Sequence, residues 1–147
     1  MRSILLTIVR ITIIFICTVA ISFALIAFLR AHIELDSSIS SINFIWQIVL
    51  LGFVAGAAMF TIPKSNALST RQTQNLFLSG CCTTASSAII LIGFCIIFMG
   101  AEWQLPLIQN TGGLIADSGI VLMCWGISMA ALELIGVIFA AARKFYQ

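Results

Sequence analysis

One carboxylate lies inside a long apolar stretch of the chain. Residues 119–142 read GIVLMCWGISMAALELIGVIFAAA, about the length that a bilayer-spanning helix needs, and their only acidic residue is Glu133. At a rise of about 1.5 Å per residue, Glu133 lies roughly 4 Å from the middle of this stretch. A carboxylate at such a depth costs a few kcal/mol, and such residues normally face the interior of a helix bundle and mark function.

Three interpretations of Glu133 are open. It is a structural carboxylate, either protonated or hydrogen-bonded to Ser, Thr or Gln on a neighbouring helix. It forms an ion pair with Arg10, which lies roughly 9 Å inside the first apolar segment if that helix begins at Ile4. Or it handles protons or cations. Glu133 and Arg10 are therefore the candidate intramembrane polar site.

Small residues mark the faces on which helices are expected to pack closely. Gly52 and Gly56 form a G-x-x-x-G pair in the second apolar segment, where a second backbone can approach. In the third segment, residues 79–88 are all small, which allows tight contact on more than one side. In the fourth segment, Glu133 shares a face of the helical wheel with small residues, so it is expected to point toward protein. The candidate helix-packing positions are Gly52, Gly56, Gly80, Gly126, Ala130 and Gly136.

The composition predicts an all-α integral membrane protein. Of the 147 residues, 61% are hydrophobic and only 8% are charged, and the mean hydropathy is +1.17. A soluble domain of this size would carry about a quarter charged residues. We expect one membrane domain over residues 1–147, a bundle of four transmembrane helices with short loops. The expected spans are residues 4–29, 42–62, 75–100 and 119–142. Residues 101–118, which include Asn110-Thr111-Gly112-Gly113, are expected to form an irregular loop.

The basic residues predict the orientation in the membrane. Six of the seven lie at the N-terminus, in the connection after the second span or at the C-terminus, whereas Arg30 lies on the other side with four acidic residues. Cytoplasmic segments carry the excess of Lys and Arg, so both termini are expected to be cytoplasmic, in a plasma or inner membrane. The six residues are Arg2, Arg10, Lys64, Arg71, Arg143 and Lys144.

The sequence offers little for catalysis or cofactor binding. His32 is the only histidine, and it lies in the predicted outer connection with Glu34 and Asp36, where a hydrated loop is expected. A bis-histidine haem, a Cys/His zinc site and a nucleophile–histidine pair in the membrane are therefore excluded. We expect no catalytic residue, no cofactor, no metal and no nucleic-acid partner.

Four spans with cytoplasmic termini, and the segment LELIGVIF at residues 132–139, resemble the arrangement and the last helix of tetraspanins. The Cys-Cys-Gly motif of the tetraspanin outer loop is missing, because Gly80-Cys81-Cys82 lies in the third apolar segment. No family is assigned from the sequence.

These features favour a small non-catalytic membrane protein that acts as an accessory or scaffold subunit. The expectation comes from the number of small-residue faces, which exceeds what four helices need to close on one another. Its partners would be the lipid bilayer and other membrane proteins or copies of itself. The alternative is a homo-oligomeric ion or proton conduit, a transporter component in which several copies bring Glu133 around a shared axis.

Overall fold

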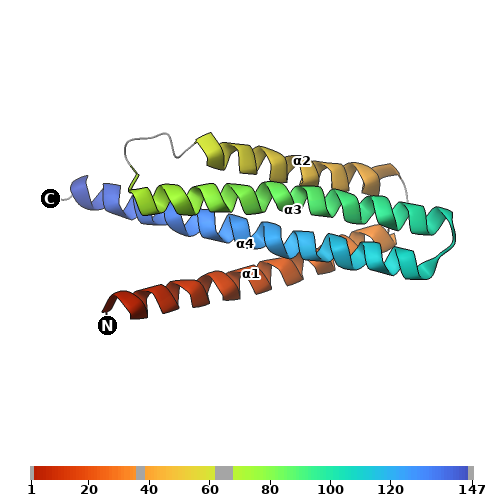
Figure 1. Cartoon of the computed structure of the whole chain (residues 1–147), viewed down its shortest axis with the longest axis horizontal. Helices are drawn as coiled ribbons and strands as arrows, with labels where there is room; N and C mark the ends of the chain where they lie inside the picture. The colour runs from red at the N-terminus through yellow and green to blue at the C-terminus, as the bar shows by residue number, and fades with distance from the viewer. Residues whose placement is uncertain (1, 36–38, 62–67, 146–147) are drawn as a thin grey trace.

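The chain folds into four helices, which Figure 1 shows in a computed structural model that describes residues 2–35, 39–61 and 68–145. They are α1 (Arg2–Leu35), α2 (Ile39–Thr61), α3 (Thr70–Glu102) and α4 (Pro106–Phe145). Helices account for 96% of the described residues. The predictions of an all-helical fold and of four helices are confirmed.

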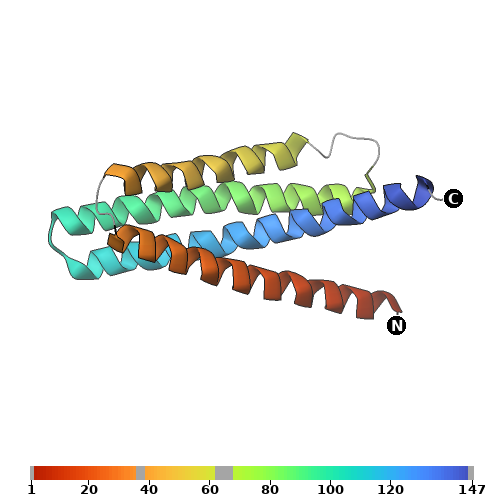
Figure 2. The same cartoon turned by 180° about the vertical axis from the view of Figure 1, so that it is seen from behind.

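The helices lie in an open row, in the order α2, α3, α4, α1. The contact between α3 and α4 is the most extensive, α2 packs on α3, and α1 packs on α4. Both views show α2 and α1 at opposite edges of the row, with α1 diverging from α4 toward its N-terminus (Figures 1 and 2). The start of α1, the end of α2, the start of α3 and the end of α4 lie at one end of the molecule. The connections from α1 to α2 and from α3 to α4 lie at the other end.

Among the residues that the structure describes, three helices are long and apolar enough to cross a membrane. These segments are Ile4–Ala31, Thr70–Glu102 and Pro106–Arg143, and a shorter apolar helix covers Ile45–Thr61. At about 1.5 Å per residue, the 40 residues of α4 extend over about 60 Å, twice the thickness of about 30 Å of a hydrocarbon core. The apolar parts of α1, α3 and α4 are longer than the spans expected from the sequence, whereas the apolar part of α2 is shorter than the expected residues 42–62.

The predicted irregular loop at residues 101–118 is wrong. Most of this segment is the first three turns of α4, and the connection between α3 and α4 is reduced to residues 103–105, with Gln104 at a positive φ of 55°. Pro106 occupies the first position of α4, where its missing N–H is tolerated. Gly112 is helical because it packs on α3: a β-carbon there would lie 2.8 Å from the carbonyl oxygen of Gly93.

The other helix boundaries also differ from the predicted spans. α3 begins five residues before the predicted residue 75, because Ser69 and Gln72 form a capping box. The backbone N–H of Gln72 donates to the Ser69 hydroxyl, and the backbone N–H of Ser69 donates to Oε1 of the Gln72 side chain. α1 continues to Leu35, so His32 and Glu34 lie on a helix and not in a loop. Residue 62, the predicted end of the second span, and Asp36 lie outside the described residues.

Hydroxyl side chains of α3 fit against glycines on both of its neighbours. On α2, the faces of Gly52 and Gly56 meet the hydroxyl oxygens of Ser87 and Thr84, and on α4 a β-carbon at Gly126 would lie 2.6 Å from Thr83 Oγ1. Without side chains at the glycines, the backbones approach closely and the α3 hydroxyls fill the space. This packing explains why α3 lies between α2 and α4.

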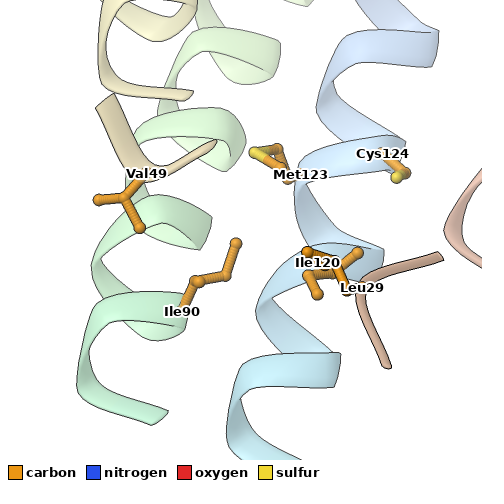
Figure 3. Close-up of a cluster of buried hydrophobic side chains, with 6 residues drawn as sticks. All are labelled: Leu29, Val49, Ile90, Ile120, Met123 and Cys124. Carbon is orange, nitrogen blue, oxygen red and sulfur yellow. The ribbon is translucent and has the colours of Figure 1, made fainter. Parts of the chain in front are cut away.

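An apolar cluster joins all four helices nearer the end that holds the α3–α4 connection. Val49 of α2 and Ile90 of α3 lie on one side of α4, and Leu29 of α1 lies on the other (Figure 3). The cluster comprises Leu29, Val49, Ile90, Ile120, Met123 and Cys124, all of them at most 5% exposed.

Candidate functional site

Arg10 and Glu133, which are 123 residues apart in the sequence, meet between α1 and α4. The guanidinium of Arg10 donates a hydrogen bond to Oε1 of Glu133, and the two form an ion pair. Glu133 is only 4% exposed, whereas 35% of the Arg10 side chain is exposed. The carboxylate is therefore inside the protein and its cation lies at the edge.

Asn75 of α3 is the second donor to this carboxylate. Its amide nitrogen lies 2.5 Å from Oε1 of Glu133, so one oxygen accepts hydrogen bonds from two other helices. The sequence analysis expected Ser, Thr or Gln as uncharged partners and missed Asn75. Asn75 lies one turn before Ser79, whose hydroxyl donates to the carbonyl of Gly126 on α4, and this α3–α4 register, which the sequence does not reveal, brings Asn75 to Glu133.

The arrangement of these three residues neutralises charge. Coulomb attraction in a medium of low dielectric constant and two charge-assisted hydrogen bonds offset the cost of burying the carboxylate. The cluster ties together α1, α3 and α4, which are adjacent in the row. No group of three His, Cys, Asp or Glu side chains that could hold a metal ion is found in the part of the chain that the structure describes.

A second ion pair joins α1 and α4 toward the opposite end of the molecule. Arg30 donates to Oδ2 of Asp117 at 2.6 Å, and 67% of the Arg30 side chain is exposed. Asp117 lies about 24 Å from Glu133 along α4, at 1.5 Å per residue. α1 is therefore attached to α4 by one buried and one exposed ionic contact.

Five of the six candidate packing positions lie in the interior, and one does not. Gly80 fits against α2, where a β-carbon would lie 3.2 Å from the Gly56 carbonyl oxygen. Gly136 differs from the expectation: it is exposed and a β-carbon there would meet no atom within 4 Å. In Figure 2, α1 diverges from the C-terminal part of α4, the part to which Gly136 belongs. The buried positions are Gly52, Gly56, Gly80, Gly126 and Ala130.

Close packing also involves glycines that the sequence analysis passed over. A β-carbon on Gly93 would lie 2.5 Å from the amide nitrogen of Ala116, and one on Gly100 would lie 2.6 Å from that of Gln109. Both contacts are between α3 and α4, in the segment that was expected to be a loop.

No known protein family, curated protein or solved structure matches this chain.

Proposed function

We propose that this chain is a multi-pass membrane protein with both termini cytoplasmic, acting as a non-catalytic subunit that packs against another membrane protein. Large apolar side chains exposed on all four helices support membrane insertion. The buried carboxylate, which is the strongest candidate for chemistry, is already engaged: Glu133 accepts from Arg10 and from Asn75.

The distribution of basic residues supports the orientation. Figure 1 places the start of α1, the start of α3 and the end of α4 at the end of the molecule that holds both chain ends, and these segments carry Arg10, Arg71 and Arg143. Arg30, at the other end, is paired with Asp117. An excess of basic residues at one end is typical of the cytoplasmic side of membrane proteins. Impermeant labelling of single cysteines introduced at residue 71 and at residue 104 tests the assignment, which requires labelling at residue 104 from outside the cell.

The main observation in support of the subunit role is the exposed face of α4 at Gly136. Gly136 and Ala140 form a small-x-x-x-small pair on α4, the motif that brings transmembrane helices together, and both are exposed. The other glycines of this kind, such as Gly52 and Gly56, are covered by a helix of the same chain. The notch at Gly136 therefore has the form of a helix-packing site and is uncovered in the single chain.

The arrangement gives less support to a homo-oligomeric conduit. A conduit needs Glu133 to face an axis shared by several copies, yet the side chain is 5% exposed and is bonded to α1 and α3 of its own chain. The arginine beside it would also repel a permeating cation, at a contact where the low dielectric constant strengthens the repulsion.

Native mass measurement after gentle extraction tests the subunit role. The variant Gly136→Leu fills the notch and is expected to lower recovery of the complex about tenfold, or ~1.4 kcal/mol. Gly113→Leu is the matched control, because Gly113 also has no atom within 4 Å of an added β-carbon but lacks a small residue four positions away.

Three results would contradict the proposal. Recovery of the chain only as a monomer from its native membrane would contradict the subunit role. A complex that Gly113→Leu and Gly136→Leu weaken equally would contradict the assignment of the notch. A closed homo-oligomer that conducts ions in liposomes would replace the proposal with the conduit.

A further inference from the structure

The contact between α1 and α4 contains three small hydroxyl side chains beside one cysteine of the apolar cluster. We call this group the α1–α4 seam and define it by Thr18 and Ser22 of α1 and by Cys124 and Ser128 of α4, all of which are buried. Asp117, which pairs with Arg30 of α1, lies about 180° around α4 from Gly126, whose face packs on α3. Cys124 and Ser128 follow Asp117 by 7 and 11 residues, about 20° from the same direction on a helical wheel.

Two further observations place these side chains between α1 and α4. Figure 3 shows Cys124 pointing away from Val49 and Ile90, on the side where Leu29 of α1 lies. On α1, Thr18 lies 11 residues before Leu29 and so on the same face, and the only extensive contact of α1 among the described helices is with α4. The antiparallel pairing set by the two ion pairs brings Ser128 within about one helical turn of Thr18 and of Ser22.

Two hydroxyls in the seam lack a hydrogen-bond partner. Thr18 is 3% exposed and Ser128 is 7% exposed, and neither Thr18 Oγ1 nor Ser128 Oγ forms a hydrogen bond with any described part of the chain. Other hydroxyls in these helices bond to their own backbone: Thr83 donates to the carbonyl of Ser79 at 2.8 Å, and Ser22 donates to the carbonyl of Thr18 at 2.6 Å. Among the described residues, the only other buried hydroxyl without a partner is that of Thr84, which lies against Gly56 of α2 and outside the seam.

An unpaired hydroxyl in a buried place is costly, and proteins most often satisfy such groups with a bound water that has two to four polar partners. We propose that the α1–α4 seam is a water-binding site, in which water accepts hydrogen bonds from the Thr18 and Ser128 hydroxyls and donates to the Ser22 oxygen. Ser22 can accept because its hydrogen is donated to the Thr18 carbonyl, which leaves the lone pairs of its oxygen available.

The surroundings limit how far the water extends. Toward the cytoplasmic end, the seam leads to the ion pair of Arg10 and Glu133, where the Arg10 side chain is one-third exposed and offers an access route. Toward the other end, the apolar side chains of Leu29 and Ile120, which are 5% and 3% exposed, separate the seam from Asp117. The seam is therefore wet from one end and closed at the other, so water in it gives no path across the membrane.

Radiolytic oxidation of the protein in lipid nanodiscs tests the proposal, because hydroxyl radicals formed from a bound water oxidise the sulfur atoms beside it. Cys124 lies in the seam, whereas Cys17, next to Thr18 in the sequence, is exposed on the outer face of α1. We expect Cys124 to be oxidised at least fivefold faster than Cys17. The double variant Thr18→Val/Ser128→Ala is expected to lower the Cys124 rate to that of Cys17, and Thr12→Val, which removes a hydroxyl bonded to its own helix, is expected to leave it unchanged.

A Cys124 rate that the double variant does not change would overturn the water site. This result is separate from a failure of the proposed function. If α1 did not face lipid, Cys17 would itself be oxidised rapidly, and the dependence of Cys124 on Thr18 and Ser128 would still decide the water site.

A cycle of stability measurements gives an independent answer. If the seam is dry, Thr18→Val and Ser128→Ala each remove an unpaired hydroxyl, so both variants unfold at higher denaturant and their effects add. If a bound water joins the Thr18 and Ser128 hydroxyls, each variant is neutral or destabilising, and their effects on the free energy of unfolding do not add. Additive stabilisation would overturn the proposal even if both variants fold well.

Discussion

Replacement of Arg10 by methionine tests whether the buried carboxylate depends on its ion pair. Arg10→Met keeps a side chain of similar length and removes the cation, so Glu133, at 4% exposure, is left with Asn75 as its donor. Removal of one partner of a fully buried ion pair costs about 3–5 kcal/mol, since the other charge is left without compensation. One-third of the Arg10 side chain is exposed and the bond to Asn75 remains, so we expect about 3 kcal/mol, the lower end of that range.

A second mutation, Glu133→Gln, tests whether the cost of Arg10→Met comes from the uncompensated charge of the carboxylate. Glu133→Gln keeps an oxygen that can accept from Asn75 and removes the negative charge. Arg10 can then turn its head toward water, so this variant alone is expected to cost about 1 kcal/mol. Added to Arg10→Met, it removes the uncompensated charge and is expected to restore about 2 kcal/mol.

Unfolding by a graded mixture of denaturing and mild detergent, followed by circular dichroism, measures these differences. Arg71→Met is the control, because Arg71 is an exposed arginine near the same end of the molecule. The reasoning is refuted if Arg10→Met lies within about 0.5 kcal/mol of the parent protein, the range of an ordinary surface substitution. It is also refuted if Glu133→Gln makes Arg10→Met worse.

Three further changes test the packing and the helix ends. Arg30→Met is expected to cost less than about 1 kcal/mol in the same unfolding assay, because that ion pair is mostly exposed, and a cost above 2 kcal/mol would show that the contact is buried. Gly93→Ala is expected to destabilise the protein by about 1–3 kcal/mol, since its β-carbon would lie 2.5 Å from the Ala116 backbone. Gly113→Ala is expected to stabilise it by up to about 1 kcal/mol, because an added β-carbon there meets no atom within 4 Å. Equal thermal midpoints for the two variants would contradict this difference. Ser69→Ala is expected to cost about 1 kcal/mol and to speed amide hydrogen exchange in the first turn of α3, and unchanged exchange there would contradict the capping box.

The four helices could be predicted from the sequence because their apolar segments are long and few polar residues interrupt them. The error at residues 101–118 has a local cause. Asn110, Gly112 and Gly113 are typical of turns, but a turn signal reports only the preference of the isolated chain. Gly112 serves a different purpose in the fold: its missing side chain lets α4 approach the Gly93 carbonyl of α3. A tertiary contact of this kind overrides the local preference for a turn, and the sequence of residues 101–118 does not predict such a contact.

The candidate polar site could be predicted in part, because a buried carboxylate such as Glu133 needs a cation or a hydrogen-bond donor beside it. Arg10 is the only cation inside the four expected spans, so the ion pair was one of the three interpretations left open by the sequence, and the structure contains it. Asn75 could not be chosen in the same way, because α3 carries many polar side chains near its start, and which of them faces α4 depends on the register. The register is set by the contacts of Gly126 with Thr83 and Ser79, which the sequence does not reveal.

The small-residue faces require a different argument after the structure is known. The sequence analysis inferred partners from a surplus of such faces, but α3 uses both of its own, one against Gly52 and Gly56 of α2 and the other against Gly126 of α4. The surplus is thereby reduced to Gly136 and Ala140, beyond the point where α1 diverges. A partner helix that settles there would lie beside the Arg10–Glu133 pair and cover the exposed part of the arginine. The stability of the pair and the affinity for a partner are then coupled, so Arg10→Met is expected to weaken the complex even though Arg10 is not part of the notch.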